Sequence, residues 1–97
     1  MNWTINQSAL QEYQEAAEWY RERSLQAAER FIFEVETAIH AICADPGRYQ
    51  PVGERVHVYR LRRFPFRIYY LPETEQLTIY AVMHERREPE YWRARLS

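Results

Sequence analysis

The chain has 97 residues and a formal net charge of -1, with 46% hydrophobic and 28% charged residues. This length supports one hydrophobic core and predicts a single domain over residues 1–97, and the composition is typical of a soluble globular protein. Apolar runs of only a few residues exclude a membrane-spanning helix, and the first residues lack the basic and apolar regions of a signal peptide. The one cysteine, Cys43, cannot form an internal disulfide, so we expect a reducing, cytoplasmic location.

The charges are distributed unevenly along the chain. All 13 basic residues are arginine. Residues 1–45 hold three arginines and eight acidic residues, a balance of -5, whereas residues 46–97 hold ten arginines and six acidic residues, a balance of +4. Guanidinium groups make planar, bidentate contacts with carboxylates and phosphates. The second half therefore favours an anionic partner.

The first half predicts a short strand followed by a helix. Residues 3–5 alternate in polarity and can add one strand to a sheet. Ser8 and Gln11 have the spacing of a capping box, which predicts a helix over residues 8–22. Apolar residues recur there at three- and four-residue intervals, and the opposite, polar side holds Glu12, Glu15, Glu18 and Glu22.

A second helix is expected after Ser24, which is a suitable N-cap. Its apolar face contains Phe31, Val35 and Ile42, and the helix ends at Asp45, where Pro and Gly follow. The short connection between the two helices predicts a helical hairpin. Residues 46–54 contain two of the five prolines and both glycines, so we expect a loop there.

The second half predicts three strands, over residues 55–63, 66–71 and 77–84. Alternation along the last strand is expected to place Leu77, Ile79, Ala81 and Met83 on one face of the sheet. Residues 88–93 predict a short helical turn. The order β-α-α-β-β-β predicts an α+β fold, with a helical hairpin packed on a mostly antiparallel sheet and a short C-terminal helical turn.

The strand and C-terminal segments together resemble the RelE/ParE superfamily, and the resemblance covers nearly the whole chain. It depends on the helical hairpin that ends in Asp45-Pro46, on Arg63-Phe64-Pro65-Phe66-Arg67-Ile68-Tyr69-Tyr70, and on Ile79-Tyr80-Ala81-Val82-Met83-His84. The pattern His-x-x-Arg-x-Pro-x-x-Trp from His84 to Trp92 is similar to the ending of ParE-like, plasmid-stabilisation proteins.

This resemblance implies a toxin of a bacterial type II toxin–antitoxin system that a cognate antitoxin neutralises. ParE-like members poison DNA gyrase by binding it, whereas RelE-like members cleave messenger RNA on the ribosome. The ParE-like ending and the lack of lysine favour gyrase. The alternatives are a ribosome-dependent mRNA endonuclease and a non-toxic binding protein that retains the fold.

The candidate site residues follow from the same resemblance and from the basic second half. Those expected to bind the target are His84, Arg86, Arg87, Tyr91 and Trp92. Those expected to bind an acidic, amphipathic antitoxin tail, and so to form a hetero-oligomer, are Arg60, Arg62, Arg63 and Arg67. If the protein were a ribonuclease, the catalytic groups would be Glu54, Arg67, His84 and Tyr91.

Each of these residues also has a structural interpretation. His84 can form a local hydrogen bond, Tyr91 and Trp92 can pack against the sheet, and the C-terminal arginines can pair with Glu85, Glu88 and Glu90. No HxxxH or CxxC spacing is present, so we expect neither a metal site nor a cofactor.

Overall fold

The computed structural model describes residues 1–87 and 89–96, without the side chains of residues 89 and 90. Seven regular elements precede a C-terminal 3₁₀ helix. They are β1 (Asn2–Ile5), α1 (Gln7–Arg23), α2 (Leu25–Ala44), β2 (Gln50–Gly53), β3 (Val56–Arg60), β4 (Phe66–Pro72), β5 (Gln76–His84) and the 3₁₀ helix η1 (Pro89–Leu96). The predicted α+β fold is confirmed. No helix in the described part of the chain is both long and apolar enough to cross a membrane.

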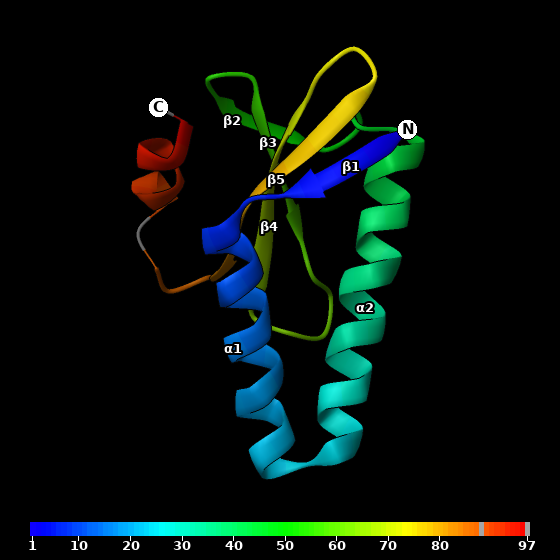
Figure 1. Cartoon of the computed structure of the whole chain (residues 1–97), viewed down its shortest axis with the longest axis vertical. Coiled ribbons are helices and arrows are strands. Elements are labelled where there is room, and N and C mark those ends of the chain that lie inside the picture. Colours follow the sequence, from blue (N-terminus) through cyan, green and yellow to red (C-terminus); the bar gives the residue numbers. More distant parts are fainter. Residues whose placement is uncertain (88, 97) are drawn as a thin grey trace.

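One mixed five-stranded sheet, in the order β1-β5-β4-β3-β2, forms the centre of the molecule. β1 pairs in parallel with the first half of β5, and the other neighbours are antiparallel. The helical hairpin lies across one face of this sheet, while η1 lies at its other side (Figure 1). The sheet is therefore covered on both faces, which explains why β4 and β5 are apolar on both sides.

Two clusters of buried side chains pack on the two sheet faces. The helical cluster joins α1 and α2 to the sheet and centres on Phe31, Ile42, Ile68, Tyr70 and Ile79. The opposite cluster, which η1 covers, contains Val56, Val58, Tyr69, Leu71, Ala81, Met83 and Trp92. The alternation predicted for β4 is confirmed, because Ile68 and Tyr70 belong to the helical cluster and Tyr69 and Leu71 to the opposite one.

The face predicted for the second half of β5 is wrong, because a β-bulge interrupts the alternation. Tyr69 pairs with Ala81 and Tyr70 with Ile79, so Tyr80 is an extra residue on β5. Ala81 and Met83 consequently lie on the face opposite to Ile79, and Val82 packs in the helical cluster. A bulge adds one unpaired residue to a strand and so exchanges the faces of every residue beyond it.

The sequence also misplaces one helix cap and misses one strand. Asn6, rather than Ser8, caps α1, because its side chain accepts a hydrogen bond from the Ala9 N–H at 2.8 Å. The main-chain N–H of Asn6 donates to the Ile79 carbonyl, so the cap also joins the start of α1 to β5. Residues 50–53, expected in a loop, form the edge strand β2, where a Pro lacking an N–H is tolerated. Ser24 caps α2 as predicted.

Candidate functional site

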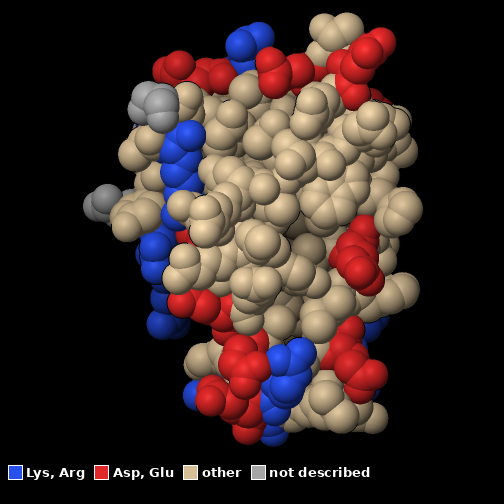
Figure 2. Space-filling model, in the orientation of Figure 1, with Lys and Arg blue, Asp and Glu red and all other residues tan. Residues whose placement is uncertain are grey.

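An apolar groove, here called the helical groove, runs between α1 and α2 over the sheet. Its volume is about 470 Å³, and side chains of Ile68, Ile79 and Val82 contribute to its lining. Its walls include three large apolar side chains that are well exposed: Trp3 (47%), Leu10 (38%) and Phe33 (70%). Figure 2 shows uncharged side chains over the middle of this face, with the charged ones gathered at its margins. An exposed apolar surface of this kind is typical of a protein-binding site.

A second hollow adjoins the helical groove and brings arginines to it. Phe33 and Thr37 line both hollows, and the second is also lined by Arg30, Arg62 and Arg63. The Glu34 carboxylate on α2 accepts hydrogen bonds from the main-chain N–H groups of Arg62 and Arg63, which fixes the β3–β4 turn against the helix. Glu34 binds the main chain of these two residues, and Arg62 and Arg63 are both exposed.

The other two arginines predicted to bind antitoxin lie on the opposite face of the sheet. Arg60 and Arg67 are directly opposite each other on β3 and β4, on the face that carries Val58 and Tyr69. Like charges in this arrangement destabilise a sheet. The Nε atom of Arg67 is buried and has no hydrogen-bond partner among the described residues. The four arginines therefore surround the β3–β4 turn, two on its strands and two within it.

The residues predicted to contact the target lie partly at the end of β5. Nδ1 of His84 accepts a hydrogen bond from the Arg86 N–H at 3.1 Å, and the His84 carbonyl accepts one from the Arg87 N–H at 2.9 Å. The imidazole ring also packs edge-on against Phe66, with 5.2 Å between ring centroids. His84 thus shapes the turn that begins the C-terminal segment.

Tyr91 lies between two guanidinium groups on the surface. The Arg87 guanidinium is 4.9 Å and the Arg95 guanidinium 5.6 Å from its ring centroid. The Tyr91 side chain is 51% exposed, and Arg86 and Arg87 are also exposed. We call His84, Arg86, Arg87 and Tyr91 the C-terminal surface.

Trp92 differs from the other predicted target-binding residues because it is only 1% exposed. Its indole stacks on Tyr69 at 5.9 Å and completes the opposite cluster. In this structure the indole offers no surface to a partner. Trp92 therefore packs against the sheet, which was the structural alternative considered from the sequence.

Three of the four residues considered for ribonuclease chemistry, Glu54, Arg67 and His84, do not converge. Phe66 pairs with His84 at one end of the sheet, whereas Glu54 lies in the β2–β3 turn, beside the end that holds Val56. Arg67 points to the face opposite to His84, because it neighbours Phe66 on β4. The Glu54 carboxylate instead pairs with Arg93 at 3.2 Å. General acid–base catalysis requires such groups within hydrogen-bond reach of one substrate.

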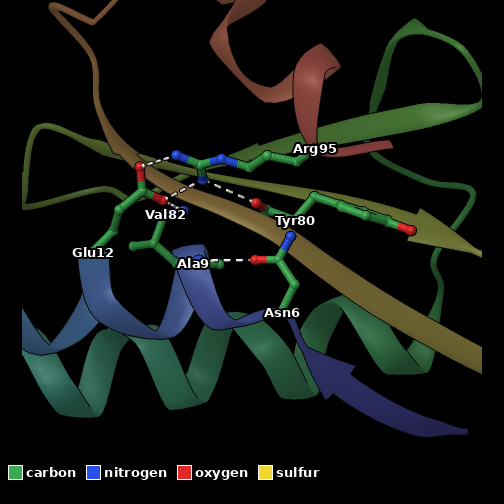
Figure 3. Close-up of polar contacts among 6 residues, drawn as sticks. All are labelled: Asn6, Ala9, Glu12, Tyr80, Val82 and Arg95. Atoms are coloured by element: carbon green, nitrogen blue, oxygen red, sulfur yellow. Dashed lines mark hydrogen bonds and ion pairs between the residues drawn. The ribbon is translucent and has the colours of Figure 1, made fainter. Parts of the chain in front are cut away.

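The sequence places Glu12 on a solvated helix face, but the structure puts it in a nearly buried ion pair. Glu12 and Arg95 have side-chain exposures of 15% and 13%, and their two hydrogen bonds are 2.8 and 2.9 Å long (Figure 3). These residues are 83 positions apart, so spacing along the chain gives no indication of the contact.

Two further titratable side chains, those of Cys43 and His57, lie in structural positions. Burial raises the pKa of the Cys43 thiol, which disfavours the reactive thiolate. Nδ1 of His57 donates to the Tyr49 carbonyl at 2.8 Å, and the ring stacks on Tyr70. In the described part of the chain, no group of three or more His, Cys, Asp or Glu residues is arranged to hold a metal ion.

A helical hairpin on one face of a mixed sheet, with a C-terminal segment on the other, defines a small toxin-like domain of the RelE/ParE type. The sequence model of one protein family, described as the ParE toxin of the type II toxin–antitoxin system parDE, matches residues 4–89 of this chain. The chain belongs to the ParE toxin family. The resemblance inferred from its strands and C-terminal pattern is confirmed.

A solved structure shares this fold. It is a chain of the "Chromosomal ParDE TA system from P. aeruginosa", with a TM-score of 0.64 and 17% sequence identity. The alignment covers 87% of this chain and 95% of that one. No curated protein matches the sequence.

Proposed function

We propose that this protein is the toxin of a type II toxin–antitoxin pair, and that it arrests growth by binding DNA gyrase in the cytoplasm until its cognate antitoxin neutralises it. The observation that carries the proposal is the match of residues 4–89 to the ParE toxin family. The exposed helical groove and C-terminal surface supply two separate regions for the two partners.

The helical groove is suited to bind an amphipathic antitoxin tail. Its apolar walls suit the apolar side of such a tail, and the adjoining hollow offers Arg30, Arg62 and Arg63 to acidic residues on the other side. A disordered acidic segment can wrap such a surface and order on binding. The cross-strand pair of Arg60 and Arg67 extends the basic region around the same turn, where an acidic residue would offset their repulsion.

The exposed residues of the C-terminal surface favour a toxin that acts by binding its target. Tyr91, Arg86 and Arg87 are exposed together, and Tyr and Arg are the residue types that often dominate protein interfaces. The separation of Glu54, Arg67 and His84 supports binding over RNA cleavage, because these three side chains are not assembled around one point.

The experiment is inducible expression in bacteria, with and without the neighbouring open reading frame. We expect growth arrest with induction of the DNA-damage response, and relief of both when the neighbour is co-expressed. Double variants matched in charge separate the two surfaces. Arg62→Ala with Arg63→Ala should weaken neutralisation while toxicity remains, and Arg86→Ala with Arg87→Ala should weaken toxicity while antitoxin binding remains.

Arrest of translation without DNA damage would support the mRNA endonuclease instead. Normal growth with soluble, folded protein would support a non-toxic member of the family. Either outcome would contradict the proposal.

A further inference from the structure

The C-terminal segment crosses the sheet and contacts it at three points. Arg93 reaches the β2–β3 hairpin, where it pairs with Glu54 and donates to the Val52 carbonyl. Trp92 packs on β4 through Tyr69, and Arg95 reaches the other side of the sheet at β5. The Arg95–Glu12 pair is nearly buried, with side-chain exposures of 13% and 15%, whereas the Arg93–Glu54 pair is 38% and 60% exposed.

Arg95 and Glu12 meet the main chain of β5 on the edge that faces away from β4, just beyond the end of β1. β1 ends its pairing at Ile79, and the bulge at Tyr80 follows at once. The Glu12 carboxylate accepts a hydrogen bond from the Val82 N–H at 3.0 Å, and the Arg95 guanidinium donates one to the Tyr80 carbonyl at 3.0 Å (Figure 3). An unpaired strand edge presents both donors and acceptors, and this ion pair satisfies one of each.

The same arginine connects the buried contact to the surface. Its guanidinium lies 5.6 Å from the ring centroid of Tyr91, whose other neighbour is Arg87. A continuous set of contacts therefore runs from Glu12 on α1, through Arg95, to the exposed side chains of the C-terminal surface.

We propose that Glu12 and Arg95 are positioning residues for the toxin's target-binding surface, acting together as a clamp between α1, the free edge of β5 and η1. This inference rests on the proposed function, in which the C-terminal surface binds gyrase. The clamp holds η1 in one orientation, so that Tyr91 and Arg87 are preorganised when the target is met. Neither clamp residue needs to touch the target.

An ordinary surface ion pair provides the matched control. Glu18 and Arg21 pair at 2.6 Å on the same helix as Glu12, but their side chains are 58% and 48% exposed. Such exposed pairs contribute little to stability. The test compares the clamp variants Glu12→Gln and Arg95→Met with the control variants Glu18→Gln and Arg21→Met, and Arg95→Lys is a milder clamp variant that keeps the charge.

The first readout is the fluorescence of Trp92, which is independent of activity. Trp3 and Trp19 are exposed and are replaced by Phe, so that Trp92 is the only tryptophan left. We expect the clamp variants to remain folded and to unfold cooperatively. Their Trp92 emission should shift to longer wavelength, and acrylamide should quench it more strongly. The control variants should leave both unchanged, and Arg95→Lys should give an intermediate result if Arg95→Met does not fold.

The second readout is gyrase inhibition, measured with the native tryptophans in place. We expect the clamp variants to need at least about tenfold more protein for half-inhibition, with antitoxin binding unchanged, since a tenfold change corresponds to about 1.4 kcal/mol. The exchanged pair Glu12→Arg with Arg95→Glu should not restore inhibition. A guanidinium on α1 cannot accept a hydrogen bond from the Val82 N–H, and a carboxylate on η1 cannot donate one to the Tyr80 carbonyl.

Unchanged Trp92 emission in Arg95→Met, full inhibition despite a displaced Trp92, or recovery in the exchanged pair would each overturn the proposal. A wild-type protein that does not inhibit gyrase would contradict the proposed function instead. Trp92 emission would then still decide whether the clamp holds η1.

Discussion

The hydroxyl of Tyr70 donates a hydrogen bond to the main-chain carbonyl of Pro46 at 2.6 Å. Tyr70 is fully buried in the middle of β4, and Pro46 follows the end of α2. One contact thus joins the central strand of the sheet to the segment that leads from the helical hairpin into β2. Its loss is expected to affect the packing of both layers.

Tyr70→Phe should lower the free energy of unfolding by about 1–2 kcal/mol, because it removes one hydrogen bond and leaves the Pro46 carbonyl without its partner. Tyr49→Phe is a suitable comparison, because Tyr49 is a half-buried residue packed against the same cluster. Its hydroxyl makes no such hydrogen bond to the described residues. Urea unfolding measures both. Equal stability of Tyr70→Phe and wild type would show that the bond contributes nothing.

Stability should also fall in alkaline solution. Burial, with further contributions from Tyr49 and Asp45, raises the pKa of Tyr70 well above its usual value of 10.0. Burial likewise raises the pKa of Tyr13, Tyr20 and Tyr59. The unfolded tyrosines therefore lose protons at a lower pH than the folded ones, so stability is fully present below about pH 10 and declines as the pH rises further.

The measurement is the urea midpoint between pH 9 and pH 11. We expect a decline above pH 10 that is shallower in Tyr70→Phe, which lacks one of the groups responsible. A midpoint that stays constant over this range would contradict the raised pKa values.

Much of the fold could be predicted because it depends on local patterns. The three- and four-residue spacing of apolar residues predicted the helical hairpin, and Ser24 predicted the start of α2 correctly. Alternation predicted the faces of β4, because that strand is regular up to Leu71. The predicted cap of α1, Ser8, was wrong, because the main-chain bond of Asn6 to Ile79, a tertiary contact, favours the earlier start.

The features that were missed depend on contacts between distant segments. β2 is an edge strand whose residues have weak strand propensity, so its pairing with β3 stabilises it. The bulge at Tyr80 directly follows the last residue of β5 that pairs with β1, and no pattern within β5 indicates it. The pairing of Glu12 with Arg95 likewise joins segments that are far apart in the chain.

Trp92 should behave as a core residue. Trp92→Ala is expected to lower the free energy of unfolding by about 3–5 kcal/mol, the usual cost of removing a large buried aromatic side chain. Trp19→Ala removes an indole that is 50% exposed and should cost much less. Thermal or denaturant unfolding of the two variants gives the comparison, and a small effect at Trp92 would argue against its place on Tyr69.

Antitoxin binding should depend on the arginines of the β3–β4 turn. Arg62→Ala with Arg63→Ala is expected to weaken binding at least about tenfold, and the wild-type affinity should fall as salt rises because the contacts are charged. Arg48→Ala is a control at an exposed arginine outside the two hollows. Equal binding after Ala replaces Arg60, Arg62, Arg63 and Arg67 together would exclude an acidic tail at this turn.

The central claim is that the protein acts on gyrase by binding. The most direct measurement adds purified protein to gyrase and scores loss of supercoiling together with trapped DNA cleavage complexes, with wild type and His84→Ala side by side. We predict inhibition by wild type, with at most a modest loss in His84→Ala, because His84 shapes a turn through its hydrogen bond to Arg86. Unaffected gyrase, alongside message cleavage on translating ribosomes that falls about 10²–10⁴-fold in His84→Ala, would contradict the account.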